Sequence, residues 1–181
     1  MKHNKESLSE SKPLQVLLDT LPQVGRVEWI GLRPSKDESM LAVDQVQVVM
    51  NKGLEGDRFK GRPGSRRQVT LIQQEHLKVI ASCLNMESVS PELLRRNIVV
   101  SGVNLLALKN KVFRIGDAIL EFTGLCHPCS KMERQLGAGG YNAMRGHGGI
   151  TARVCEAGLV RLNDKVAFLS NALEFKPEER K

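Results

Sequence analysis

The sequence predicts a mainly β fold, a mixed or antiparallel β-barrel with peripheral helices. About eight short runs rich in Val, Ile, Leu and Phe recur along the chain, separated by Gly, Pro, Asn and Asp, which is typical of strands joined by turns. Only two or three segments have apolar residues at helical spacing, and they do not alternate regularly with the strands. A doubly wound parallel sheet requires that alternation, so a β-rich barrel is favoured.

Length and composition limit the classes of protein. The chain has 181 residues, of which 41% are hydrophobic, so one domain with a proper core is expected. The apolar runs are short, so we predict neither a signal peptide nor a membrane span, and a cytoplasmic location follows by default. Four cysteines with one close pair do not suit a disulfide framework. The net charge of +7 predicts an anionic partner: a phosphate ester, a nucleic acid or an acidic protein.

Charged ends flank the expected domain. Residues 1–12 have the composition of a disordered tail, and a short helix with an apolar stripe follows up to Leu21, before Pro22. We expect this helix to cover one end of the core, because isolated helices of this length are marginal. The expected units are residues 1–23 (tail and helix), 24–170 (the domain) and 171–181 (a second charged tail).

In the first half of the domain, the sequence predicts three strands and two helices, followed by a fourth strand, IVVSG. The strands are Val27–Leu32, Val46–Met50 and Gln68–Ile72. The helix Gln73–Leu84 follows, and we interpret His76 and Cys83 within it as structural. A shorter helix starts at Ser90 and leads into the strand IVVSG. Arg95 and Arg96 lie at this junction, where we interpret them as a solvated pair favoured by the helix C-terminus; the alternative is a guanidinium directed into a cleft.

Two glycine-rich segments are candidate binding loops. GLEGDRFKGRPG, Gly53–Gly64, combines flexible backbone with cationic side chains, and it is either an ordinary turn or a loop that wraps an anion. GAGGYNAMRGHGG, Gly137–Gly149, matches neither a Walker loop nor a dinucleotide fingerprint, and we interpret it as a mobile lid or binding loop.

The second half of the domain supplies the remaining strands. Val112–Gly124 predicts two strands around a turn at Gly116. Ile150–Gly158 and Lys165–Leu169 predict the closing strands.

The stretch EFTGLCHPCSKM, Glu121–Met132, is the strongest candidate for chemistry. It reads as a strand that ends in a turn, followed by a helix, with Cys126 and Cys129 between the two. A thiol near a helix start, with Lys131 and Arg134 within about one turn, is expected to ionise more easily. The alternative is a pair of half-buried cysteines in a turn.

Three chemistries could use these two thiols. Structural zinc needs four ligands, usually as two close pairs, and only one pair exists. A thioredoxin-like redox pair requires a βαβ context, and the flanking strands are expected to be antiparallel. A single reactive thiolate that ligates a soft metal or carries sulfur, with cations holding an anionic cofactor beside it, uses both the motif and the basic charge.

The motifs GLEGDRF, RRNIVVSG, FRIGDAILEFTG, CHPCSKM and ITARVCEAGLVRLNDKVAFL, in this order, resemble the MOSC domain, the C-terminal domain of molybdenum cofactor sulfurases. The resemblance covers roughly Val24 to Leu169 and rests on order and spacing together. It implies a β-barrel-like fold of the type found in single-domain bacterial members, and a role with the molybdenum cofactor, a pterin with a dithiolene and a phosphate.

The resemblance also assigns site residues. Cys129 matches the family's invariant cysteine and would ligate molybdenum or carry sulfur, whereas Cys126 falls at a variable position. Arg95 and Asn97 match the family's R-x-N-[IL]-x-V pattern, and Arg95 would help to hold the cofactor. Further cofactor contacts are expected from Gln73, Arg67 and Arg145.

What the resemblance implies about activity is less specific. Similar domains accompany a pyridoxal-phosphate domain in sulfurases and an amino-terminal barrel domain in reductases of N-hydroxylated compounds; we find neither companion in this sequence. We therefore expect a protein that binds molybdopterin or a sulfurated precursor, that carries sulfur or reduces N-oxygenated compounds, and that works with a sulfurase or reductase partner. The alternative is a non-catalytic basic module for RNA or an acidic protein, against which stands the small number of aromatic residues available for base stacking.

Overall fold

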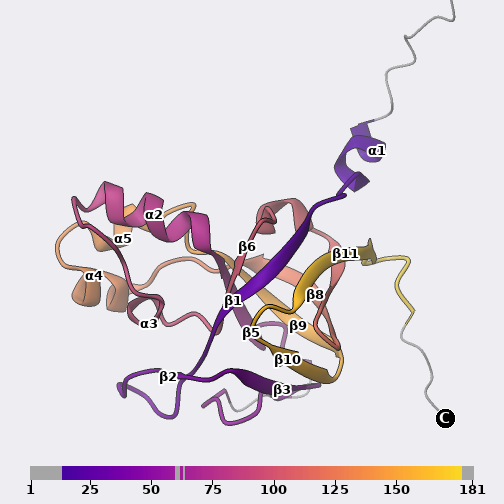
Figure 1. Ribbon diagram of the computed structural model, residues 1–181, viewed down its shortest axis with the longest axis horizontal. Coiled ribbons are helices and arrows are strands. Elements are labelled where there is room, and N and C mark those ends of the chain that lie inside the picture. The colour runs from indigo at the N-terminus through magenta and orange to yellow at the C-terminus, as the bar shows by residue number, and fades with distance from the viewer. Residues whose placement is uncertain (1–13, 60–61, 63, 177–181) are drawn as a thin grey trace, which may run out of the picture.

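The centre of the protein is a closed β-barrel, seen in a computed structural model that describes residues 14–59, 62 and 64–176 (Figure 1). Its seven strands are β1 (Val24–Leu32), β5 (Val69–Gln73), β6 (Ile98–Ser101), β7 (Lys111–Ile115), β8 (Ala118–Leu125), β9 (Ile150–Glu156) and β11 (Lys165–Asn171). They follow one another in the order β11-β7-β8-β9-β5-β6-β1, and the antiparallel pairing of β1 with β11 closes the ring. Among the described barrel pairs, β5 and β6 are parallel and the others antiparallel. The predicted mixed β-barrel is therefore confirmed.

A smaller antiparallel sheet lies beside the barrel (Figure 1). It consists of β3 (Gln45–Val49), β4 (Gly53–Leu54) and β10 (Gly158–Arg161), while the two-residue β2 (Leu41–Ala42) pairs with β1. The two expected closing strands are present in the barrel as β9 and β11, but the sequence did not predict β10, which forms between them and pairs with β3.

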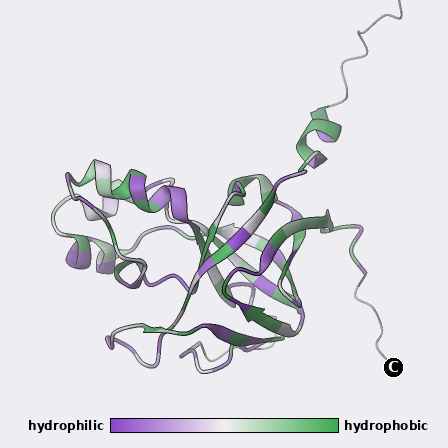
Figure 2. Ribbon diagram, viewed as in Figure 1, coloured by the Kyte–Doolittle hydropathy of each residue, from purple (hydrophilic) through white to green (hydrophobic). Residues whose placement is uncertain are grey.

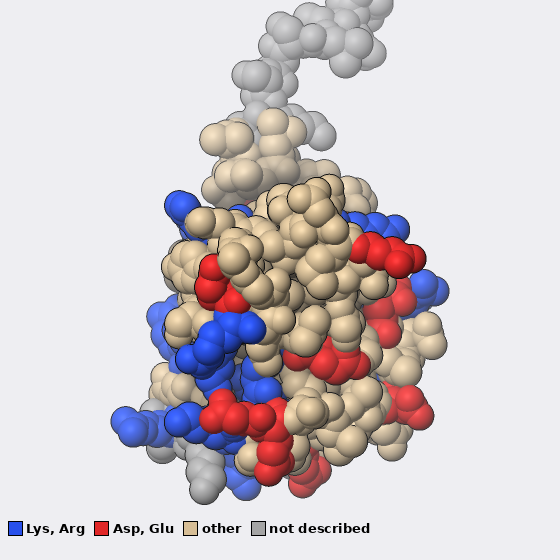
Figure 3. All heavy atoms as spheres, turned by 90° about the vertical axis from the view of Figure 1, so that its left-hand side faces the viewer, with Lys and Arg blue, Asp and Glu red and all other residues tan. Residues whose placement is uncertain are grey.

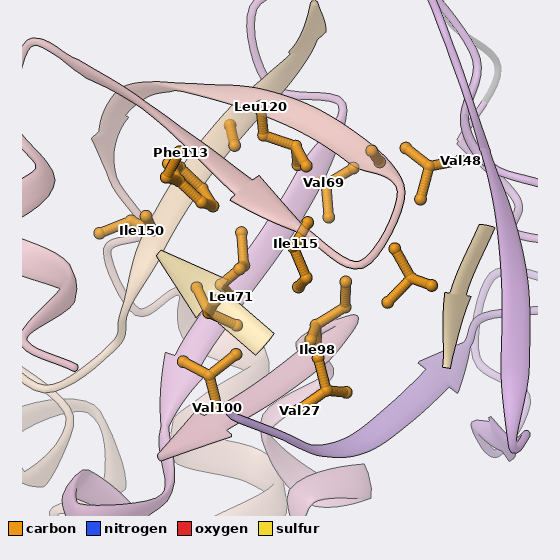
Figure 4. Packing of buried hydrophobic residues seen from close by; sticks show 14 of the residues in the cluster. Val27, Val48, Val69, Leu71, Ile98, Val100, Phe113, Ile115, Leu120 and Ile150 are labelled. Carbon is orange, nitrogen blue, oxygen red and sulfur yellow. The ribbon is translucent and has the colours of Figure 1, made fainter. Parts of the chain in front are cut away.

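The barrel interior is filled by alternating apolar side chains. The smaller sheet adds to the same core: in β3, Val46 and Val48 are buried while the residues beside them are more exposed, which is the period of two expected of a strand with one buried face. Figure 4 shows such side chains meeting inside the barrel, among them Leu71, Ile98 and Phe113, all fully buried. Removal of this apolar surface from water is the main force that holds the barrel together.

Helices pack on one end of the barrel and form a second core against two of its strands, β5 and β6. They are α2 (Gln74–Cys83), α3 (Pro91–Leu94), α4 (Ser130–Leu136) and α5 (Gly140–Ala143), with a 3-10 helix, η1 (Leu105–Leu108), elsewhere. Leu71 and Ile98 point into the barrel core, whereas their neighbours Ile72 and Val99 join a second core with the helices. Both faces of β5 and β6 are therefore buried, and the parallel pairing follows from the crossover through α2 and α3.

The first described helix, α1 (Leu14–Asp19), does not cover the core. None of its residues is buried, and it projects from the barrel as an apolar segment (Figures 1 and 2). Contacts of Asp19 with Lys111 and Asn171 connect its end to the barrel. The expectation that it covers one end of the core is wrong, because its apolar stripe faces outward. The tail expected at residues 1–12 lies outside the described residues. In the described part of the chain, no helix is both long and apolar enough for a membrane crossing.

Candidate functional site

The cysteine motif occupies the loop between β8 and α4, as the sequence predicts. Cys126 is buried, and its backbone N–H donates to Gly149 O at 2.8 Å. Cys129 is exposed and directly precedes α4, where its carbonyl accepts from the N–H of Met132 at 2.8 Å. The two thiols therefore differ in environment, and only that of Cys129 is open to a ligand from solvent.

The guanidinium of Arg96 holds this loop in place. The residue is 6% exposed and donates to three backbone carbonyls: Nη1 to Leu94 at 2.8 Å, Nη2 to Cys126 at 3.1 Å and Nε to Gly148 at 2.7 Å. Burial lowers the pKa of Arg96, while nearby Cys126 and Cys129 raise it. The interpretation of Arg95 and Arg96 as a solvated pair is thus wrong for Arg96, because the helix-to-strand junction turns this side chain inward onto the cysteine loop.

Arg95 points to a different segment. It takes a left-handed conformation (φ 53°) at the end of α3, and its guanidinium donates to Glu38 O at 2.7 Å and to Ser35 O at 3.4 Å. The half-buried side chain is therefore bound to the irregular segment between β1 and β2. Its expected contact with a cofactor stays a prediction.

Asn97 lies in a buried polar network. Its Oδ1 accepts from the backbone N–H and the hydroxyl of Thr70, and its Nδ2 donates to Gly31 O and to Asp57 Oδ1. These contacts join β5, β6 and the loop after β4. The observed role of the amide is to connect barrel segments, and the cofactor contact that the resemblance implies for it stays a prediction.

The carboxylate of Asp57 anchors the first glycine-rich loop. It accepts from the Arg33 guanidinium at 2.6 and 3.0 Å, and from the backbone N–H groups of Arg33 and Phe59. Burial raises the pKa of Asp57, but its hydrogen bonds and the charge of Arg33 together outweigh burial, so the net shift of this pKa is downward. Gly56 and Asp57 thus form a structural turn; Lys60, expected to be one of this loop's cations, lies outside the described residues.

We expect Asp57→Asn to lower the free energy of unfolding by about 2 to 3 kcal/mol at neutral pH, because it breaks a buried charged hydrogen-bond pair. Because folding lowers the pKa of this carboxyl group, its ionised form stabilises the folded protein at pH values above the ordinary carboxyl pKa of about 4. This contribution is lost as the pH falls through the lowered pKa of the folded state. Urea unfolding from about pH 7 to about pH 3 should therefore show the two proteins converging at acid pH. Asp44→Asn, at an exposed carboxylate, is the control. A gap that does not change with pH would contradict the assignment.

Two other expected cofactor contacts, Gln73 and Arg67, differ in their exposure to solvent. Gln73 is buried at the end of β5 and accepts from the N–H of Leu105 at 3.1 Å. Arg67 is exposed just before β5, and the charges of Arg33 and Arg67 both act on Arg96, lowering its pKa. Arg33 and Arg67 are thus close enough to Arg96 for their charges to act on it.

Arg145 lies in the second glycine-rich segment and shares a hollow with the proline of the cysteine loop. Together with His127, Pro128, Tyr141 and Asn142 it lines a hollow of about 780 Å³, open to solvent. On the side of the molecule that carries α2 to α5, basic side chains gather mainly at the lower left of the view, with acidic side chains beside them (Figure 3). The hollow joins the cysteine loop to the second glycine-rich segment.

The second glycine-rich segment is more ordered than the expected lid. It contains α5, and Met144 is fully buried in the helix core. A Cβ atom at Gly149 would lie 1.9 Å from Leu71 O, so only glycine lets this segment lie so close to β5. The rings of His76 and His147 meet edge to face at 5.0 Å, which joins α2 to the same segment. The interpretation as a lid is therefore corrected for this part, which is packed against the barrel.

Sequence reasoning missed Arg33 and gave Arg96 the wrong environment. Both act through partners far along the chain, Asp57 for Arg33 and the carbonyls of Cys126 and Gly148 for Arg96. The sequence carries a weak signal at most, namely that Arg33 directly follows a β-prone run and Arg96 directly precedes one.

Similarity to known proteins agrees with this architecture. Among solved structures, the YuaD protein of Bacillus subtilis has 21% sequence identity and a TM-score of 0.71, covering 81% of this chain and 96% of that chain. YiiM from Escherichia coli has 19% identity and a TM-score of 0.62, covering 82% of this chain and 74% of that one. YiiM from Geobacillus stearothermophilus has 14% identity and a TM-score of 0.67, covering 81% and 75%. At these identities the likeness establishes the fold alone.

The sequence comparison is more specific. No curated protein matches the chain significantly. The family model described as the MOSC domain matches residues 56–167, more than half of the chain, and this range includes Arg96, the cysteine loop and the second glycine-rich segment. The chain therefore belongs to the MOSC domain family.

Proposed function

We propose that this protein binds the molybdenum cofactor, or a sulfurated precursor of it, with the Cys129 thiolate as metal ligand or sulfur carrier. The observation that carries the proposal is the exposure of Cys129 beside the buried guanidinium of Arg96. Arg67 adds positive charge near Arg96, whereas the charge of Arg33 is paired with Asp57. A soft sulfur donor next to concentrated positive charge suits a soft metal in an anionic cofactor.

The residues present fit such a group. A thiolate is a soft ligand for a metal whose other ligands come from its own dithiolene. Among the described residues, no three His, Cys, Asp or Glu side chains come together to hold a metal, and Cys129 is the one protein ligand that we propose. The hollow of about 780 Å³ beside His127 and Pro128 lies within the range of small-molecule sites, and Arg145 on its wall could pair with an anionic substituent.

The protein's own residues have separable tasks in this proposal. Arg96 fixes the carbonyls of Cys126 and Gly148, which positions the loop that presents the Cys129 sulfur. Arg67, which is exposed, makes the surroundings of Arg96 more favourable for an anion. The buried Cys126 contributes packing and one backbone hydrogen bond to Gly149, and we assign it no chemical role.

Two reactions are compatible with this arrangement. As a sulfur carrier, the Cys129 thiolate attacks the outer sulfur of a donor protein's persulfide; the donor's S–S bond breaks, its electron pair leaves with the donor thiolate, and Cys129 becomes the persulfide. As part of a reductase, the bound cofactor would supply two electrons, received from a partner reductase, to break an N–O bond, with two protons completing the amine and water. The protein's contribution in both cases is to hold and expose one sulfur atom.

Cys129→Ser is expected to abolish bound molybdenum or persulfide, because an alcohol is a poor soft ligand and cannot carry sulfane sulfur. Cys126→Ser should retain most of it, and Cys83→Ser, at an exposed cysteine on α2, is the control. Elemental analysis and pterin fluorescence on protein from a cofactor-competent host, with intact-mass analysis for an added sulfur atom, give the readout. Equal loss in the Cys126 and Cys129 variants would indicate a redox pair instead, and absence of metal, pterin and persulfide from the wild type would refute the proposal.

A further inference from the structure

A small cationic hollow lies beside the cysteine loop. It measures about 100 Å³ and is lined by Arg95, Lys131, Arg134, Gln135 and Asp37. Arg95 comes from the end of α3, whereas Lys131 and Arg134 come from α4, which begins directly after Cys129. Three cationic side chains from two helices therefore converge on a space of the size of a small oxyanion.

An acidic side chain of the protein already occupies this cationic environment. The carboxylate of Asp37 lies 2.6 Å from the ammonium of Lys131. Lys131 first, and also the charges of Lys36 and Arg95, lower the pKa of Asp37, so this carboxylate is ionised at neutral pH. Arg95 is bound to the same segment through the carbonyls of Ser35 and Glu38.

The ion pair between Asp37 and Lys131 is weak enough for another anion to displace it. The side chain of Asp37 is 70% exposed, and an exposed ion pair adds little net stability. Asp37 also has φ 130°, a conformation that is unfavourable for a residue with a side chain. The segment that carries it, residues 33–40, has no regular secondary structure. Weak attraction and backbone strain together make a more highly charged anion an effective competitor.

We infer that Arg95, Lys131 and Arg134 form a binding site for an oxyanion of the phosphate class, and that Asp37 occupies this site as an internal substitute until such a ligand displaces it. Arrival of the ligand releases Asp37 from Lys131 of α4, beside the exposed thiol of Cys129. The inference rests on the proposed function only in taking Cys129 as the neighbouring reactive group, since oxyanion binding itself requires no metal.

Removal of the internal competitor should strengthen binding. An internal competitor lowers the apparent affinity of a ligand, because the ligand can bind only in the fraction of molecules whose site is free. We therefore expect Asp37→Asn to bind inorganic phosphate about fivefold more tightly than the wild type. Lys131→Gln should weaken binding about tenfold, because it removes a charged contact. Glu38→Gln is the matched control: it removes one exposed negative charge from the same segment but leaves the Asp37–Lys131 pair intact, and its affinity should change less than about twofold.

The experiment is a titration of ¹⁵N-labelled full-length protein with inorganic phosphate at constant ionic strength, followed through the amide signals of Asp37, Glu38 and Lys131. Saturable shifts at these amides, with the order of affinities given above, support the inference. Equal gains for Asp37→Asn and Glu38→Gln would overturn it, because general charge would then explain both. Unsaturable shifts spread over the basic surface mean an adventitious ion only, and also overturn it.

Repeating the titration on cofactor-loaded protein distinguishes two sources of the oxyanion. Loss of phosphate binding on loading assigns the site to the phosphate of the cofactor, whereas retained binding assigns it to an anionic substrate. Failure of the phosphate titration leaves metal binding by Cys129 untouched, and failure of metal binding leaves the titration valid, so the two proposals fail separately.

Discussion

Arg96→Met is expected to lower the free energy of unfolding by about 3 to 5 kcal/mol, because it removes a buried guanidinium that donates to three backbone carbonyls. The guanidinium donates to Leu94, Cys126 and Gly148, and methionine can replace its volume but none of its hydrogen bonds. The carbonyls would have to admit water or move apart. We therefore expect the cysteine loop to lose its fixed position before the barrel unfolds.

Chemical denaturation monitored by circular dichroism measures the loss of stability, and hydrogen exchange at Cys126, whose N–H is bonded to Gly149, measures the local effect. Arg134→Met, at an exposed arginine of α4, provides the matched control and should change stability by less than about 0.5 kcal/mol. Arg96→Lys should recover only part of the loss, because one ammonium lacks the planar fork that reaches three carbonyls. A destabilisation below about 1 kcal/mol in Arg96→Met would show that the loop is held by other contacts.

Gly149→Ala should destabilise the protein by about 4 kcal/mol, for two separate reasons. Gly149 has φ +83°, which an alanine adopts only at a cost. The added methyl would also lie 1.9 Å from Leu71 O and 2.9 Å from Ile72 Cα, so the backbone must move away from β5. That movement breaks the hydrogen bond between Cys126 N and Gly149 O.

Gly146→Ala separates these two costs. Gly146 has nearly the same backbone conformation, φ +81°, but a Cβ atom there would meet nothing within 4 Å. Its substitution should therefore cost only the conformational term, about 1 kcal/mol. Thermal or urea unfolding of both variants gives the comparison. Similar losses for the two would mean that close packing against β5 contributes nothing.

Local patterns predicted the elements well where a segment's own residues decide its structure. The hairpin around Gly116 and the helix Ser130–Leu136 formed as expected, because a turn signal between two β-prone runs and a run of good helix formers are local properties. The position of Cys129 between a strand and a helix follows from those two elements alone.

Features that depend on distant partners could not be predicted in the same way. The burial of Arg96 is decided by carbonyls 30 and 52 residues away, and the pairing of β10 is decided by β3, more than a hundred residues earlier. The amphipathic pattern of α1 correctly gave a helix, but it could not tell whether a surface existed for its apolar side to cover. The chemical roles of the expected site residues are likewise not a property of any one segment.

The pairing of β1 with β11 has a consequence for the order in which the molecule can form. Val24 lies opposite Ala167, so the ring cannot be completed until β11, the last of the described strands, has been synthesised. Until then β1 and β7 each expose an unpaired edge, a surface that readily adds strands from other chains. The nascent protein is therefore most vulnerable to aggregation late in translation, when nearly all of its core residues are present but the ring is still open.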